Sequence, residues 1–114
     1  MPIISPNASM KDAILSISEG MIGTTIIADE DGKLMALMSD GDVRRALICK
    51  DFSLEDNVLK YATKNPTAID DVDMLASDAL VLIEEKKIQL LVITDKDNKV
   101  QGLLHIHTLI EKGI

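Results

Sequence analysis

The sequence predicts an α+β fold made of two copies of one βαββα unit. The first observation is an internal repeat: shifting the chain by 66 positions aligns residues 12–46 with 78–112 without a gap, and pairs such as Asp12/Asp78 and Asp29/Asp95 are identical. The second is that each copy shows a helical apolar pattern followed by two short apolar runs joined by a turn. Because half of a 114-residue chain is too small to bury a sufficient core alone, we expect the two copies to pack together.

The first copy opens with an extended piece over residues 2–6, followed by a helix. Ser9, with Asp12 three residues later, forms a capping-box pattern in which Asp replaces the usual Glu. Strands are expected over 24–28 and 34–38, joined at the turn 29–32, whose glycine supplies the positive φ that hairpins need. A helix over about 40–50 closes the copy. The residues expected on the buried face of the first helix are Met10, Ala13, Ile14, Ile17 and Met21.

The second copy repeats this order, with an extended piece over 66–69, strands over 90–94 and 100–104 and a turn at 95–98. Its first helix is apolar all round over 79–83, so we expect it to be the more deeply buried of the two. A final helix is expected over about 107–112. The strands are near-continuous apolar runs in both copies, which indicates that both faces of each sheet are covered.

These patterns divide the chain into unit 1 over residues 1–50 and unit 2 over 51–114. Residues 53–64 have the pattern of a helix that leads into unit 2, and subtracting 66 places their counterpart before residue 1. Unit 1 therefore lacks its lead-in helix; either another element supplies it, or the chain was cut from a longer polypeptide, which we favour. Sheet-on-sheet packing about a pseudo-twofold axis would leave a cleft between the units.

Composition excludes several classes of partner. The chain has 12 Lys and Arg against 19 Asp and Glu, a net charge of −7, and no basic run, which argues against binding to nucleic acid or to an anionic membrane. Its apolar runs are far shorter than the ~20 residues that span a bilayer, and the N-terminus lacks a signal-peptide pattern. A single cysteine, Cys49, allows no internal disulfide and fits a reducing compartment. We expect a soluble, cytoplasmic protein.

Residues 36–42, Ala-Leu-Met-Ser-Asp-Gly-Asp, and the Gly-Leu-Leu at 102–104 end the strand pair of each copy. With the tandem βαββα pattern, they resemble the CBS domain, and the whole chain resembles a CBS pair, or Bateman module. Residues 39–47 and 102–110 are similar to the C-terminal CBS pair of bacterial arabinose-5-phosphate isomerases, although Ser39 stands where Thr is commoner and Thr108 where Asp is usual. That family carries an upstream sugar-isomerase (SIS) domain, which is not in this chain.

The start of the helix at residue 40 is the strongest candidate for a ligand site. Free backbone N–H groups over Asp40 and Gly41 favour an anion, Ser39 can donate a hydroxyl to a phosphate, and Asp42 can accept from a ribose diol. The resemblance implies these roles for Ser39 and Asp42. From the residues alone, the favoured interpretation is structural, with Ser39 as an N-cap and Asp42 as a first-turn charge that stabilises the helix start. Arg44 and Arg45 diverge by about 100° on a helix, so only one can face the cleft, and we favour Arg45.

Further candidates lie at strand ends. Thr24 and Thr25 open a strand where CBS pairs usually receive the base, and Thr67 lies in the lead-in strand of unit 2, although threonine is common in any strand. His105 and His107 would donate hydrogen bonds to a ligand or play a structural role, because two imidazoles alone make a poor metal site. Since unit 2 has His105 and Thr108 in place of the Ser and Asp, we expect binding to be concentrated in unit 1.

No nucleophile–base pair, Walker-type loop or zinc spacing is present, so we expect no catalytic residues, no metal and no cofactor in this chain. The resemblance implies a regulatory module for an arabinose-5-phosphate isomerase, binding a nucleotide or nucleotide sugar. CMP-Kdo is favoured, as a feedback inhibitor of Kdo synthesis for lipopolysaccharide or capsule. The alternatives are a ligand-free oligomerisation module of the isomerase, with CBS pairs forming a homodimer, and an adenylate-sensing CBS pair of another protein.

Overall fold

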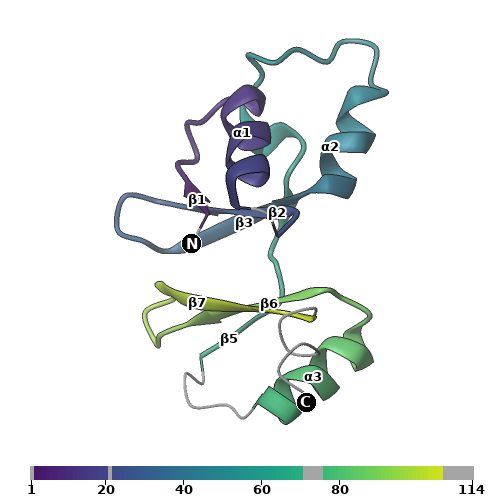
Figure 1. Ribbon diagram of the computed structural model, residues 1–114. Helices are drawn as coiled ribbons and strands as arrows, with labels where there is room; N and C mark the ends of the chain where they lie inside the picture. The colour runs from purple at the N-terminus through teal and green to yellow at the C-terminus, as the bar shows by residue number, and fades with distance from the viewer. Residues whose placement is uncertain (1, 21, 71–75, 107–114) are drawn as a thin grey trace. The chain divides into compact units, whose positions relative to one another are not determined.

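The computed structural model describes residues 2–20, 22–70 and 76–106 of the 114-residue chain (Figure 1). Contacts divide the chain into two compact units, Met1–Pro66 and Thr67–Ile114. Within the described residues, no helix is long and apolar enough to cross a membrane.

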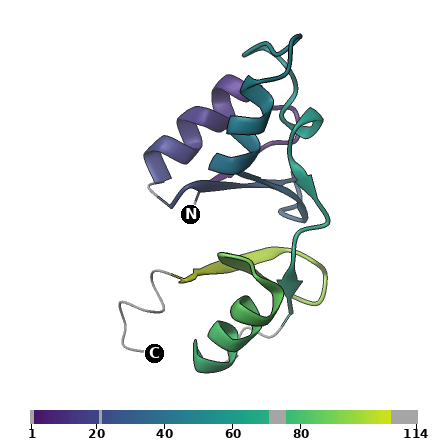
Figure 2. The ribbon, with the colours of Figure 1, turned by 90° about the vertical axis from the view of Figure 1, so that its right-hand side faces the viewer.

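Unit 1 is a four-stranded sheet with two helices on one face. Its strands are β1 (Ile3–Ile4), β2 (Thr24–Ala28), β3 (Leu34–Ser39) and β4 (Thr63–Lys64), in the order β1-β2-β3-β4. β1 is parallel to β2, and the other two pairs are antiparallel. The helices α1 (Met10–Gly20) and α2 (Asp40–Leu47) lie on the same side of the sheet (Figures 1 and 2).

Unit 2 repeats this arrangement with β5 (Ala68–Ile69), α3 (Ala76–Lys86), β6 (Leu90–Thr94) and β7 (Val100–His105), in the sheet order β5-β6-β7. The register is the same 66 residues apart: β2 pairs with β3 as β6 pairs with β7, and each pair shows an irregularity one residue before the end of its first strand. The structure therefore confirms the repeat and all four central strands. The expected helix over 107–112 lies outside the described residues.

The two hairpin turns are built alike. In the first, the Asp29 carboxylate accepts from the backbone N–H groups of Asp31 and Lys33, both at 2.9 Å. In the second, Asp95 accepts from residues 97 and 99 at the same distances. The positive φ that the sequence assigns to Gly32 is present at 83°, and its counterpart Asn98 adopts 66°, a conformation that asparagine tolerates better than most residues.

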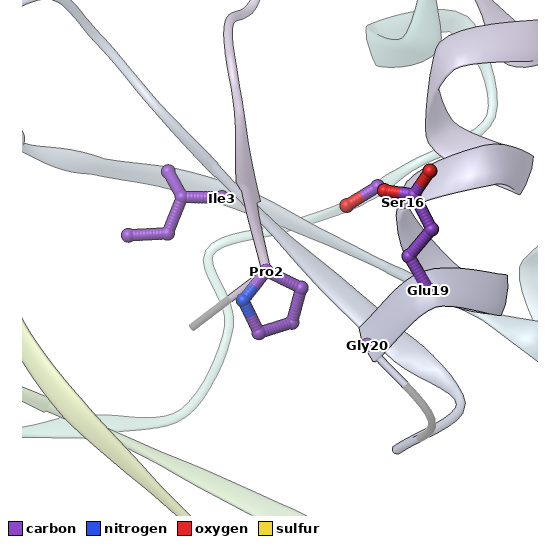
Figure 3. A pocket seen from close by; sticks show the side chains of 5 residues that line it. All are labelled: Pro2, Ile3, Ser16, Glu19 and Gly20. Carbon is purple, nitrogen blue, oxygen red and sulfur yellow. The ribbon is translucent and has the colours of Figure 1, made fainter.

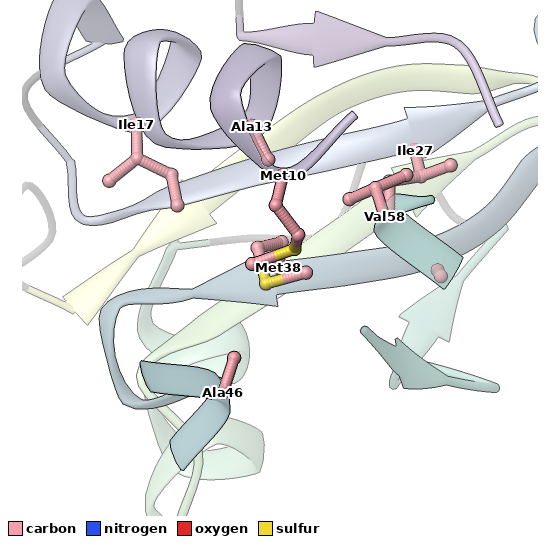
Figure 4. Packing of buried hydrophobic residues seen from close by; sticks show 8 residues of the cluster. Met10, Ala13, Ile17, Ile27, Met38, Ala46 and Val58 are labelled. Carbon is pink, nitrogen blue, oxygen red and sulfur yellow. The ribbon is translucent and has the colours of Figure 1, made fainter. Parts of the chain in front are cut away.

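The core of unit 1 lies between the helices and the sheet (Figure 4). Every second residue of β2 faces α1, and all five β2 residues are buried, so both faces of this strand are covered as the sequence predicts. The buried cluster consists of Met10, Ala13, Ile17, Ile27, Ala36, Met38, Ala46 and Val58. The capping box at the start of α1 is also formed, with Asp12 N–H donating to Ser9 Oγ and Ser9 N–H to Asp12 Oδ2.

The helix α3 is not more deeply buried than α1, contrary to the prediction. Only Ala79 and Ile83 are buried on the helix among the described side chains, packing with Leu91 and Ile93 of β6, while Val81 is 53% exposed. The apolar residue Val81 therefore does not indicate that the outer face of α3 is buried, since protein surfaces carry many apolar residues.

Residues 51–66 do not form the expected helix over 53–64 and pack within unit 1. Only a 3₁₀ turn, η1 (Val58–Lys60), is helical. Hydrogen bonds hold the segment to the start of α1: Met10 N–H donates to the Asp56 carbonyl at 2.8 Å and Val58 N–H to the Ala8 carbonyl at 3.0 Å. Because Val58 is fully buried in the core and β4 extends the sheet, the contact boundary falls at Pro66, whereas we expected it at residue 50.

Replacing Ile27 by Ala should destabilise the protein by about 2–5 kcal/mol, because it removes methyl groups from a fully buried position on the sheet. Ile48→Ala is the matched control: that side chain is 83% exposed, so its change should stay within about 0.5 kcal/mol. Urea unfolding followed by circular dichroism measures both. Equal losses for the two variants would contradict this description of the core.

Candidate functional site

The candidate site of unit 1 is built where β3 ends and α2 begins. Ser39 is the last residue of β3 and the N-cap of α2. Its hydroxyl accepts from the Asp42 N–H at 3.2 Å, and its own N–H donates to Asp42 Oδ2 at 3.0 Å. The two residues therefore form a reciprocal capping box, which is the structural role that the sequence left open for them.

Asp42 is more than a cap, because its carboxylate is buried and accepts hydrogen bonds from two further side chains. Arg45 Nη2 lies 2.6 Å from Oδ1, and the Thr63 hydroxyl lies 3.1 Å from both carboxylate oxygens. The Asp42 side chain is 6% exposed, whereas that of Arg45 is 70% exposed. Of the two arginines, Arg45 is thus the one beside the candidate site. Thr63 is the residue that the sequence analysis missed, since it comes from a strand 21 residues away.

Asp40 and Gly41 complete the first turn of α2. The Asp40 N–H donates to the Gly23 carbonyl at 2.9 Å, which ties the end of the α1–β2 loop to the helix start. The sequence prediction of a free N–H at Asp40 is therefore wrong, because the preceding loop satisfies this donor. The Arg45 guanidinium lies over Gly41, so a Cβ at this position would come within 3.3 Å of its Nη1. An alanine at position 41 would require the Arg45 guanidinium to shift by a few tenths of an ångström.

Thr24 and Thr25 are buried at the start of β2. The Thr25 hydroxyl donates to the Pro2 carbonyl at 3.1 Å and lies 2.8 Å from Ser16 Oγ, so it is already engaged within unit 1. Beside it lies an open hollow of about 370 Å³, lined by Pro2, Ile3, Ser16, Glu19 and Gly20 (Figure 3). None of the predicted ligand residues lines this hollow.

Two predicted residues of unit 2, His105 and Thr67, lie at or next to the strands of its own sheet. His105 is the last residue of β7, is 8% exposed, and pairs with Leu90 as Ser39 pairs with Thr24. The Thr67 carbonyl accepts from Val92 N–H at 3.4 Å. His107 lies outside the described residues. Among the residues that the structure describes, no group of three or more His, Cys, Asp or Glu side chains could hold a metal ion.

The CBS domain family matches the chain twice, over residues 1–49 and 58–113. The chain belongs to the CBS domain family.

The relatives of this CBS pair are longer proteins. It is 45% identical over 114 residues to an uncharacterized protein of Helicobacter pylori strain J99, and 32% identical over 117 residues to the arabinose 5-phosphate isomerase KdsD of Yersinia pestis. Each alignment covers 100% of this chain and 34% of the relative. The chain thus spans about a third of the length of these relatives.

Solved structures show the same fold. The crystal structure of CBSX2 in complex with AMP has a TM-score of 0.83 at 24% identity and covers 97% of this chain and 85% of its own. The CBS domain protein PAE2072 from Pyrobaculum aerophilum, complexed with AMP, has a TM-score of 0.78 at 18% identity, with coverages of 98% and 91%.

A second polar cluster of this CBS pair lies in the segment that joins α2 to β4. The Tyr61 hydroxyl donates to Asp56 Oδ2 at 2.7 Å, Ser53 N–H donates to the same oxygen at 2.9 Å, and Lys60 Nζ lies 3.8 Å away. The hydrogen bond from Tyr61, followed by that from Ser53, lowers the pKa of the Asp56 carboxyl below its ordinary value. The rings of Phe52 and Tyr61 pack here with centroids 5.7 Å apart.

Asp42→Ala should cost about 2 kcal/mol of unfolding free energy, because it leaves donors of Ser39 and Thr63 without their partner. Asp12→Ala, which removes the same box from the exposed start of α1, should cost about 1 kcal/mol. Urea unfolding of both variants measures the difference. A smaller loss for Asp42→Ala than for Asp12→Ala would contradict its role as a buried acceptor.

Tyr61→Phe should raise the pKa of Asp56 toward the ordinary value near 3.9. With the folded pKa below the unfolded one, Asp56 stabilises the fold above the unfolded pKa, and this contribution is lost as pH falls through the folded pKa. The variant should therefore lose less stability on acidification. Carboxyl-carbon NMR titration of the wild type and the variant measures the pKa of Asp56; an unmoved Asp56 would contradict the assigned cause.

Proposed function

We propose that this CBS pair is a regulatory module that binds a nucleotide or nucleotide sugar within an arabinose-5-phosphate isomerase. The alignment of the whole chain with KdsD supports the parent activity, and the AMP complexes of CBSX2 and PAE2072 support the ligand class. The observation that carries the proposal is the buried Asp42 carboxylate beside the start of α2, a pair of groups suited to a ribose diol and an anion. The module itself supplies binding, and the rest of the parent chain supplies the chemistry.

Each residue of the candidate site has a distinct role in this proposal. The Ser39 hydroxyl and the Gly41 N–H of the first turn donate to the phosphate, and Arg45 adds positive charge. Asp42 accepts hydrogen bonds from the ribose hydroxyls, as acidic residues do in other nucleotide sites. Thr24, Thr25, Thr67, His105 and His107 remain predicted positions for the base and the remaining ligand groups.

CMP-Kdo is the effector that we favour for this site. It combines a ribose diol, a phosphate and an acidic sugar, and as the end product of the pathway that uses arabinose 5-phosphate it would act by feedback inhibition. The effector can shift the equilibrium between two conformations of the isomerase only by the difference between its binding free energies for them. The site lies in a cytoplasmic enzyme under this proposal, in keeping with the single exposed cysteine, Cys49.

A second function, assembly of the isomerase through a homodimer of CBS pairs, is favoured by exposed apolar side chains of unit 1. Leu47 and Ile48 at the end of α2 are 56% and 83% exposed, and Leu54 is 44% exposed. Light scattering of the chain without nucleotide tests this function: a dimer whose formation Ile48→Glu abolishes supports it, and a monomer at high concentration contradicts it.

Isothermal titration calorimetry of the chain with CMP-Kdo, CMP, AMP, ATP and arabinose 5-phosphate tests the ligand proposal. We expect heat from at least one nucleotide and none from the sugar phosphate. Asp42→Asn should weaken that binding about tenfold or more, because it removes a charged acceptor. Asp12→Asn changes the same type of box at the start of α1 and should leave binding unchanged. No binding heat with any nucleotide, or an equal loss of affinity in the two variants, would overturn the proposal.

A further inference from the structure

We propose that Thr63 is a positioning residue that competes with the nucleotide for Asp42 and so couples ligand binding to the strand that joins the two units. This inference rests on the function proposed above. Thr63 lies in β4, outside the start of α2, and would act on the same candidate site.

The argument starts from the number of hydrogen bonds that Asp42 accepts. Its Oδ2 receives Ser39 N–H at 3.0 Å and Ser39 Oγ–H at 3.1 Å, its Oδ1 receives Arg45 Nη2, and the Thr63 hydroxyl lies 3.1 Å from both oxygens. A carboxylate offers about four lone-pair sites. The acceptor capacity of Asp42 is therefore used within unit 1, and ribose hydroxyls can bind only if an internal donor leaves.

Thr63 is the donor best suited to leave. The Ser39 N–H is fixed by the backbone of the capping box, and Arg45 forms a short, charge-assisted contact of 2.6 Å. The Ser39 hydroxyl, which is assigned to the phosphate, frees one acceptor site when it turns, and the two hydroxyls of a ribose diol need a second. The Thr63 hydroxyl is neutral and shared between two oxygens, and its residue is exposed on a strand of two residues. Rotation of one side chain frees the acceptor without breaking the cap of α2.

The loss of this contact affects the junction between the units. β4 is held to β3 through two residue pairs, Ala36 with Lys64 and Leu37 with Thr63. The hydroxyl of Thr63 adds the connection from β4 to α2. Two residues further on, the chain turns at Asn65, with φ of 54°, before unit 2 begins at Thr67. A ligand that takes the place of Thr63 on Asp42 thereby weakens the attachment of the joining segment to unit 1.

Thr63→Val tests the inference, because valine keeps the shape and strand preference of threonine and removes the hydroxyl. With its competitor gone, Asp42 should bind the best nucleotide of the calorimetric series about three- to tenfold more tightly. Hydrogen exchange of the segment 61–66 should be faster than in the wild type without ligand and should no longer accelerate when the nucleotide is added. Thr63→Ser, which keeps the hydroxyl, should restore wild-type behaviour.

Thr94→Val is the matched control, since it removes the hydroxyl of a buried threonine in a strand of unit 2, where it donates to the Ile69 carbonyl. It should leave nucleotide affinity unchanged. Unchanged or weaker binding by Thr63→Val, with a wild-type exchange response, overturns the role of Thr63 and leaves the proposed function intact. Absence of nucleotide binding by the wild-type chain overturns both, and the wild-type titration distinguishes the two results.

Discussion

A buried carboxylate must receive hydrogen bonds to replace those it loses to water, and in unit 1 this requirement falls on Asp42. Its partners come from three places: the end of β3 through Ser39, the second turn of α2 through Arg45, and β4 through Thr63. One side chain thus fixes where a strand ends, how a helix starts and where the joining segment attaches. The candidate site is a consequence of the same constraint, because the acceptor is held in one orientation before any ligand arrives.

The pattern Ser-x-x-Asp occurs three times in the sequence, and all three occurrences form hydrogen bonds between the same two positions. Those at Ser9 and Ser53 have exposed or partly exposed carboxylates and act in caps or turns. Only the one at Ser39 has a buried carboxylate with additional donors. Local sequence predicts the cap in each case, but it cannot separate the candidate site from the others, because burial and Thr63 depend on contacts between distant segments.

The distinction between local patterns and contacts of distant segments also explains which other features the sequence predicts. The strands, their register and both hairpin turns follow from apolar patterning and from Asp29 and Asp95, whose effects are local. The helix expected over 53–64 was wrong, because Val58 is drawn into the core of unit 1 and the backbone pairs with the start of α1. The exposure of Val81 likewise depends on which face of α3 meets its sheet. Family resemblance supplied the roles that patterning could not.

The most direct measurement is a crystal structure of the chain grown with the nucleotide that binds best. The account predicts the ribose hydroxyls on the Asp42 carboxylate, the capping box with Ser39 intact, and the Thr63 hydroxyl turned away from both oxygens. A nucleotide bound elsewhere, with the contacts between Asp42 and Thr63 unchanged, would contradict it.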